Sequence, residues 1–133
     1  MYIALGSNLG DRDAHLRAAR EKLARLPGSA LVAASSIEET APLGGMQQPP
    51  YLNQMVLLET SLEPRALLDA LHDIERSEGR SRTERWGART LDLDIVRFGQ
   101  RHVSEPGLII PHPELPNRDF WRRELAELKP DER

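Results

Sequence analysis

Two aspartates carry the clearest chemical signal of this sequence, in the run Leu91-Asp92-Leu93-Asp94-Ile95. Successive side chains of a β-strand point to opposite faces, so both carboxylates would share one face, roughly 7 Å apart along the strand. Carboxylates this close repel each other unless a cation lies between them. Mg²⁺ is commonly held by one or two carboxylates together with substrate phosphates. The run therefore indicates a candidate site for one magnesium ion or a pair, although any strand with one face in water shows the same alternation.

The segment directly before these aspartates is rich in arginine. Residues 80–89 hold Trp86 and four arginines, which are Arg80, Arg82, Arg85 and Arg89. Arginine binds phosphate oxygens through paired N–H groups and keeps its charge at any relevant pH. Trp86 offers a plane for stacking against a base or a guanidinium. Beside a metal-binding carboxylate pair, such a segment suits triphosphate chemistry; the alternative is an ordinary solvated loop.

Further polar and aromatic candidates lie elsewhere in the chain. His112, between two prolines, is a candidate hydrogen-bond donor to phosphate, and Arg118 follows it closely in the sequence. Asn53 could bind the edge of a heterocycle through its amide, and Tyr51 on the same strand face could stack on that ring. For each of these residues the alternative is a structural or solvent-facing role. Glu75 reads as a surface residue at the margin of a helix.

The elements that must position these residues can be read from periodicity. Apolar runs and alternation predict strands over 2–5, 30–37, 51–60 and 91–97, with a further short apolar run at 108–110. Helical spacing predicts a helix after Asp11 or Asp13, a second that Ser61 caps and Gly79 ends, and a third over 120–128. The order β-α-β-β-α-β is that of an α+β ferredoxin-like sandwich, with a mainly antiparallel sheet and flanking helices.

Composition limits the classes of protein that fit. The chain has 133 residues, 39% hydrophobic residues and a net charge of −3, which predicts one globular domain over 1–133 and excludes a disordered chain. The absence of cysteine excludes disulfides, thiolate metal sites and cysteine nucleophiles. We find no targeting segment and no apolar run long enough for a membrane span. We therefore expect a cytoplasmic protein without membrane or nucleic-acid partners.

Taken together, the motifs resemble the 6-hydroxymethyl-7,8-dihydropterin pyrophosphokinase family. The most specific block is Arg85-Trp86-Gly87-Ala88-Arg89-Thr90-Leu91-Asp92-Leu93-Asp94-Ile95. The other matching blocks, in the same order along the chain, are residues 3–11, 40–44, 51–53, 74–75, 79–80 and 110–113. The tail from Trp121 to Leu125 departs from the more apolar segment of the family, and Gly107 stands near where some members carry an additional arginine.

The resemblance implies an enzyme of folate biosynthesis. It would transfer the β,γ-pyrophosphoryl group of ATP to the hydroxymethyl group of the pterin and release AMP. It also implies roles by position: Asp92 and Asp94 as ligands of two Mg²⁺ ions; Arg80 and Arg89 as catalytic arginines; Glu75, Trp86, Arg89, His112 and Arg118 at ATP; and Thr40, Ala41, Leu43, Tyr51, Asn53 and Phe120 at the pterin. Loops over about 44–50 and 80–89 would close on ATP.

Two alternatives stay open from the sequence. The predicted element order also occurs in RNA-binding sheets, but the net negative charge and two aspartates without a cation would repel a phosphate backbone. A family member that binds its ligands without turnover is the second alternative, against which Asp92, Asp94, Arg89 and His112 all stand. Our prediction is a monomeric enzyme that acts on small molecules.

Overall fold

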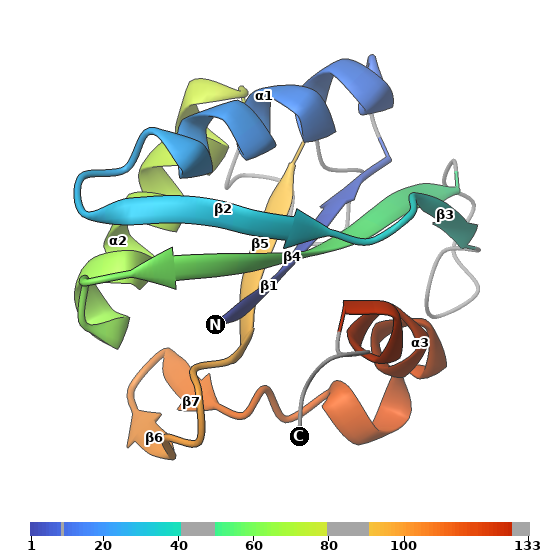
Figure 1. Cartoon of the computed structure of the whole chain (residues 1–133). Coiled ribbons are helices and arrows are strands. Elements are labelled where there is room, and N and C mark those ends of the chain that lie inside the picture. The colour runs from blue at the N-terminus through green and yellow to red at the C-terminus, as the bar shows by residue number, and fades with distance from the viewer. Residues whose placement is uncertain (9, 41–49, 80–90, 129–133) are drawn as a thin grey trace.

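The computed structural model describes residues 1–8, 10–40, 50–79 and 91–128 (Figure 1). The elements follow one another as β1 (Tyr2–Ser7), α1 (Arg12–Ala24), β2 (Ser29–Ala34), β3 (Glu38–Thr40), β4 (Tyr51–Thr60), α2 (Pro64–Ser77), β5 (Asp92–Arg97), β6 (Val103–Glu105), β7 (Leu108–Ile110), the short 3₁₀ helix η2 (Leu115–Asn117) and α3 (Asp119–Leu128). None of the described helices is long and apolar enough to cross a membrane.

The main sheet has the strand order β2-β4-β1-β5, and β3 pairs with the N-terminal end of β4. Each of these pairings is antiparallel. The short strands β6 and β7 form a separate antiparallel pair. This arrangement confirms the predicted α+β ferredoxin-like fold. It also makes β5, which carries both aspartates, an edge strand of the main sheet.

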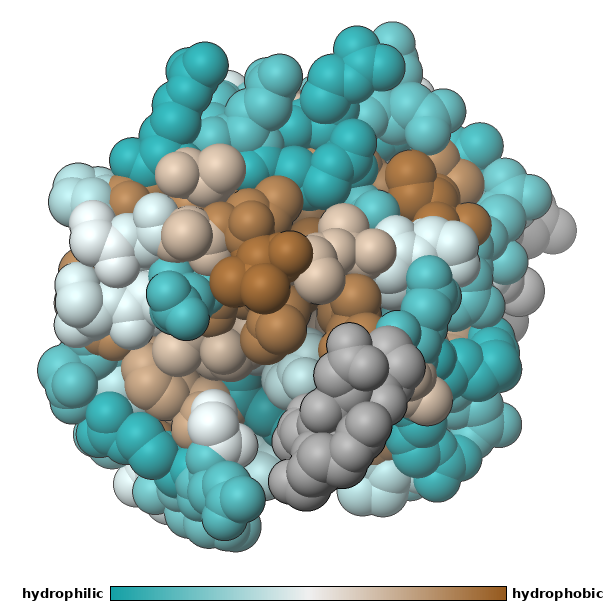
Figure 2. Space-filling view, viewed as in Figure 1, coloured by the Kyte–Doolittle hydropathy of each residue, from teal (hydrophilic) through white to brown (hydrophobic). Residues whose placement is uncertain are grey.

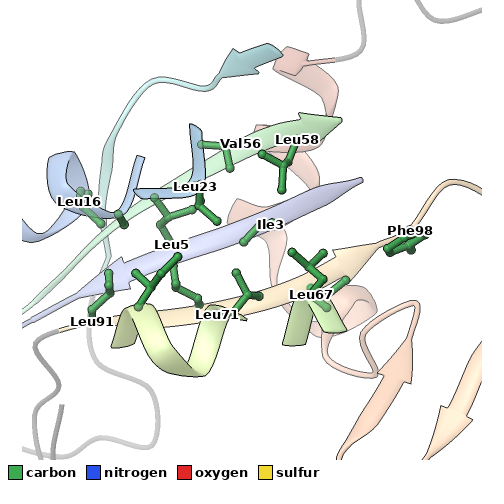
Figure 3. Close-up of a cluster of buried hydrophobic side chains, with 14 of the residues drawn as sticks. Ile3, Leu5, Leu16, Leu23, Val56, Leu58, Leu67, Leu71, Leu91 and Phe98 are labelled. Carbon is green, nitrogen blue, oxygen red and sulfur yellow. The ribbon is translucent and has the colours of Figure 1, made fainter. Parts of the chain in front are cut away.

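The sheet has two differently covered faces. On one face, Ile3, Leu5 and Val56 pack against buried leucines of α1 and α2 (Figure 3). On the other face, Met55 packs with Trp121 of α3, and α3 lies apart from α1 and α2 in Figure 1. The predicted alternation along 51–60 is confirmed, because odd and even residues of β4 enter different clusters. The face below α3 is also the face of the two aspartates.

The helix starts confirm one predicted cap and correct another. Asp11 caps α1, since its carboxylate accepts a hydrogen bond from the backbone N–H of Ala14 at 3.1 Å. The predicted cap by Ser61 is wrong: α2 begins at Pro64 after Glu63. Ser61 instead approaches Gly28, where a Cβ would lie 2.2 Å from the serine Oγ. This close contact between two turns, together with a φ of +68°, requires glycine at position 28.

The sequence patterns also missed short strands. The strands β3 and β6 have three residues each, which is too short for alternation to be recognised. The predicted strand over 30–37 ends at Ala34, because the Ser35 hydroxyl accepts a hydrogen bond from the backbone N–H of Met55 at 2.9 Å.

The outer strand β2 leaves Val32 56% exposed. Figure 2 shows apolar side chains gathered near the middle of this side of the molecule.

One carboxyl group is enclosed where α3 meets the sheet. Glu124 is 1% exposed, and neither of its side-chain oxygens has a hydrogen-bond partner among the described residues. Burial raises the pKa of Glu124 to about 9, and the neighbouring Glu38 carboxylate of β3 adds to the shift. On α3 itself, Arg123 opposes the rise and Glu127 contributes to it. Glu124 is therefore protonated in the folded protein at neutral pH.

We predict that Glu124 makes the stability of the protein fall as the pH rises. The unfolded chain loses this proton near pH 4.5 and the folded protein only near pH 9, so the free energy of unfolding decreases between these values. Glu124→Gln should remove this dependence and raise the free energy of unfolding at pH 8 by at least about 1 kcal/mol. Urea denaturation at pH 5 and pH 8 measures the effect. The exposed Glu21→Gln is the control, and equal pH dependence in the wild type and Glu124→Gln would contradict the prediction.

Candidate active site

The candidate site is built around Gly6 in the central strand β1. Gly6 pairs with Asn53 of β4 on one side and with Asp92 of β5 on the other. Two residues away, Ala4 lies opposite Asp94. Because residues opposite each other in a sheet share a face, Asn53, Asp92 and Asp94 all project toward the side of α3. Neighbouring strands are about 4.8 Å apart, so the backbones of Asn53 and Asp92 lie roughly 10 Å apart across the sheet.

Gly6 is buried, and its missing side chain lets Asn53 and Tyr51 lie close to the backbone of β1. A Cβ at this position would lie 3.4 Å from Asn53 Oδ1 and 3.6 Å from Tyr51 Cδ1. A longer side chain would therefore extend between the asparagine and the tyrosine. Glycine within a strand often marks a place where a ligand approaches the backbone closely, and the neighbours of Gly6 fit that explanation.

The structure brings together three of the residues predicted at the pterin. Asn53 Nδ2 donates a hydrogen bond to Thr40 Oγ1 at 2.6 Å, and Thr40 of β3 pairs with Tyr51 of β4. Asn53 is 7% exposed, so the strands β3 and β4 hold its amide in one orientation. The opposite edge of the amide, Oδ1, points toward Gly6. The group offers a fixed polar edge beside an aromatic ring.

On the β5 side, a histidine accompanies the second aspartate. His112 Nε2 lies 3.7 Å from Asp94 Oδ1. The backbone N–H of His112 donates to the carbonyl of Val96 at 2.9 Å, which ties the segment after β7 to β5. The N–H of Glu114 donates to His112 Nδ1 at 3.0 Å. Because Nδ1 accepts, the neutral ring carries its proton on Nε2 and presents that donor on the side of Asp94.

An aromatic group at the start of α3 stands behind this histidine. The Trp121 ring contacts the His112 ring edge-on, with centroids 4.9 Å apart, and the guanidinium carbon of Arg118 lies 4.5 Å from the Trp121 centroid. Phe120 contacts Trp121 as well, at 6.3 Å between centroids. The structure thus joins His112, Arg118 and Phe120 through a tryptophan that the sequence patterns did not single out. Its place next to Phe120, in the departing tail, was the only available signal.

The prediction that Glu75 is a surface residue is wrong. Glu75 is 2% exposed, and its Oε2 accepts a hydrogen bond from the backbone N–H of Leu93 at 2.7 Å. Leu93 stands between the two aspartates on the edge strand β5, so its N–H needs a partner from outside the sheet. Glu75 of α2 supplies that partner and fixes the backbone that carries Asp92 and Asp94. The spacing of apolar residues along α2 could not predict this burial, because the hydrogen-bond partner of Glu75 lies 18 residues further along the chain.

The comparisons with known proteins agree with this geometry. The family model described as 7,8-dihydro-6-hydroxymethylpterin-pyrophosphokinase matches residues 2–130. The chain is 45% identical over 131 residues to the 2-amino-4-hydroxy-6-hydroxymethyldihydropteridine pyrophosphokinase of Pseudomonas aeruginosa, covering 98% of this chain and 81% of that protein. The chain belongs to the hydroxymethylpterin pyrophosphokinase family. The resemblance seen in the motifs is thereby confirmed.

Two further pyrophosphokinases with the same printed name are similar to this member of the family. The protein of Haemophilus influenzae is 44% identical over 130 residues, with 98% of this chain and 81% of the relative covered. The protein of Bacillus subtilis is 44% identical over 127 residues, with 96% and 76% covered. The match therefore extends over almost all of the chain and most of each relative.

Some residues that the resemblance places in the pyrophosphokinase site lie outside the described residues. These are Ala41, Leu43, Arg80, Trp86 and Arg89, together with the expected loops over 44–50, apart from Pro50, and 80–89. The described residues of the predicted site lie on β3, β4, β5 and the start of α3, and in the segments that follow β7 (His112) and η2 (Arg118). Glu75 lies on α2, against the other face of the sheet. The roles of these residues stay predictions.

The carboxylates of β5 fit the magnesium ions expected for a pyrophosphokinase of this family. Leu91, Leu93 and Ile95 are buried while Asp92 and Asp94 are partly exposed on the other face, as alternation predicted. No group of three His, Asp or Glu side chains within the described ranges could complete a metal site. Two carboxylates are sufficient where phosphate and water supply the other oxygen ligands, as is common for Mg²⁺.

We predict that Gly6→Val lowers the affinity for the pterin while the protein stays folded. Valine is favourable in a strand, but its methyl groups would occupy the space between Asn53 and Tyr51. We expect the Kd of the pterin to rise at least about tenfold, because the ring loses its access to the amide. Calorimetry measures the Kd, and a thermal melt checks folding. Leu57→Val at the other end of β4 is the control; unchanged pterin affinity in Gly6→Val would contradict a pterin site beside Gly6.

Proposed function

We propose that this pyrophosphokinase binds the pterin on the β4 side of Gly6 and the triphosphate of ATP on the β5 side. The observation that carries this proposal is the pairing of Gly6 with Asn53 on one side and Asp92 on the other. The sheet thereby holds a heterocycle-reading amide and a metal-binding carboxylate at a set separation. The pterin hydroxyl and the β-phosphorus of ATP would meet between them, which supplies the orientation that the transfer requires.

At the pterin end, the fixed polar edge of Asn53 would form hydrogen bonds with the ring. Thr40 Oγ1 orients the amide through the 2.6 Å hydrogen bond, so little conformational entropy is lost on binding. Tyr51 lies on the same strand face and Phe120 approaches from α3. The two aromatic rings would enclose the pterin from its two sides.

At the ATP end, Asp92 and Asp94 would hold two Mg²⁺ ions. When bound, the ions would neutralise the bridging phosphate oxygens and so favour displacement at phosphorus. Glu75 keeps the strand in place through its bond to Leu93. His112 presents its Nε2–H beside Asp94, and the guanidinium of Arg118 lies over the Trp121 ring at 4.5 Å. Both groups would donate to phosphate oxygens.

The reaction forms one bond and breaks one bond. The hydroxymethyl oxygen of the pterin bonds to the β-phosphorus of ATP, and the bond from that phosphorus to the oxygen shared with the α-phosphate breaks. AMP leaves with that oxygen, and the hydroxyl proton is released. Negative charge grows on the leaving oxygen as the bond breaks, so fixed donors such as His112 and Arg118 stabilise the transition state more than the ground state.

We also propose that the single domain acts as a cytoplasmic monomer. Pairing within one sheet brings Asn53, Asp92 and Asp94 to one face, so this part of the site needs no second copy of the chain. Sedimentation of the active protein tests this proposal, and activity confined to a dimer would contradict it.

Product analysis tests the proposed function directly. The purified protein is incubated with ATP and Mg²⁺, with and without 6-hydroxymethyl-7,8-dihydropterin, and the nucleotides are separated. We expect AMP only when the pterin is present. ADP would mean transfer of a single phosphoryl group, and no product would indicate a member that has lost turnover. Salt-sensitive RNA retention in a filter assay without Mg²⁺ would favour the nucleic-acid alternative.

We predict that Asp94→Asn and Asn53→Ala separate the two halves of the site. Asp94→Asn keeps the shape but removes a charged metal ligand, so kcat should fall at least about a hundredfold with little change in pterin Kd. Asn53→Ala leaves polar groups of the pterin unpaired, so pterin Kd should rise about tenfold or more while ATP affinity changes little. Steady-state kinetics and calorimetry measure both. Equal loss of the two ligands in either variant would contradict the proposed division.

A further inference from the structure

Trp121 is the common neighbour of His112 and Arg118, the two side chains proposed at the triphosphate. Its ring meets the His112 ring at an interplanar angle of 89° and a centroid distance of 4.9 Å. The guanidinium carbon of Arg118 lies 4.5 Å from the same ring. Trp121 itself is 2% exposed and packs in the cluster of Met55, Val96 and Leu125. A fixed aromatic ring therefore contacts two side chains that remain partly exposed.

These contacts limit where His112 and Arg118 can lie. An arginine side chain loses about 2 kcal/mol of rotamer entropy when it is held in one position, and a cation–π contact offsets part of that cost before any ligand arrives. The edge-on contact orients the imidazole in addition to the hydrogen bond that its Nδ1 accepts from Glu114. The Arg118 Nε has no hydrogen-bond partner among the described residues. That Nε is enclosed, whereas the terminal guanidinium N–H groups form no ion pair among the described residues and can receive an anion.

We propose that Trp121 is a positioning residue of this enzyme, which holds Arg118 and His112 in the orientation that receives the triphosphate of ATP. The inference rests on the proposed roles of Arg118 and His112 in ATP binding. Trp121 touches neither reactant in this proposal; it acts through its two neighbours. A purely structural tryptophan would support the whole α3 side of the site, whereas a positioning tryptophan affects ATP more than the pterin.

The test compares three variants of the full chain. Trp121→Leu keeps an apolar side chain but removes the aromatic face, and Trp121→Phe restores an aromatic face. Leu125→Ala is the matched control, because Leu125 is 6% exposed in the same cluster of the same helix but has no aromatic face to offer His112 or Arg118. The melting temperature of each variant shows how much stability the substitution costs. Kinetics and calorimetry then give KM and Kd for ATP and for the pterin.

We expect Trp121→Leu to raise the KM and Kd for ATP about tenfold, in keeping with the loss of one cation–π and one aromatic contact. The pterin Kd should change several-fold less than the ATP Kd, because Trp121 reaches the pterin side only through its 6.3 Å contact with Phe120. Trp121→Phe should recover most of the ATP affinity. Leu125→Ala should lower the melting temperature with near-native ATP affinity. Equal weakening of both ligands in Trp121→Leu, or native ATP affinity in that variant, would overturn the proposal.

Two further measurements distinguish this inference from the proposed function. A nuclear Overhauser contact between the Trp121 indole and the His112 imidazole protons is expected in the free protein, and its absence would overturn the positioning geometry. The double variant His112→Ala/Arg118→Ala should bind ATP weakly, with no added loss from Trp121→Leu. Native ATP affinity in the double variant would overturn the ATP roles and the inference together. Added loss from Trp121→Leu in that background would overturn the inference alone.

Discussion

The hydrogen bonding of β1 between β4 and β5 is the constraint on which the site depends. Antiparallel pairing on both sides fixes which residues stand opposite Gly6, and hence places Asn53 and Asp92 on either side of it. A shift of one residue in either register would turn these side chains into the opposite, apolar face. That face is filled by α1 and α2 (Figure 3), so burial of the core and correct placement of the polar groups favour the same register.

Helix α3 covers only part of the other face of the sheet. Met55 and Val96 pack under α3, while Asp92 and Asp94 of β5 stay partly exposed on the same face. Helix α3 is held at its outer end by polar contacts: Glu127 accepts hydrogen bonds from the backbone N–H and the hydroxyl of Ser36 at 2.8 and 2.9 Å. The enclosed Glu124 beside them lowers the stability of the folded protein as the pH rises. This helix also brings Phe120 and Trp121 to the site, so its docking couples stability to ligand binding.

The β5 side of the site illustrates how the edge of a sheet is used. An edge strand has backbone groups that the sheet does not pair. Two of these groups find hydrogen-bond partners outside the sheet. Glu75 accepts a hydrogen bond from the N–H of Leu93, and the N–H of His112 donates one to the carbonyl of Val96. The first bond steadies the aspartates and the second places the histidine 3.7 Å from Asp94. The same interactions that complete the edge strand therefore assemble the carboxylates and a histidine N–H donor in one place.

The sequence by itself determined the order of the longer helices and strands, the two faces of β4 and β5, and the family. These features depend on alternation, on helical spacing and on a specific block of neighbouring residues, all of which are local. It did not reveal the buried carboxylates of Glu75 and Glu124, the contact of Gly28 that displaced Ser61 from its expected capping role, or the place of Trp121 between His112 and Arg118. Each of these depends on a partner distant along the chain or on a tertiary contact, and only the packing of strands and helices decides which groups are enclosed and which stay open to a ligand.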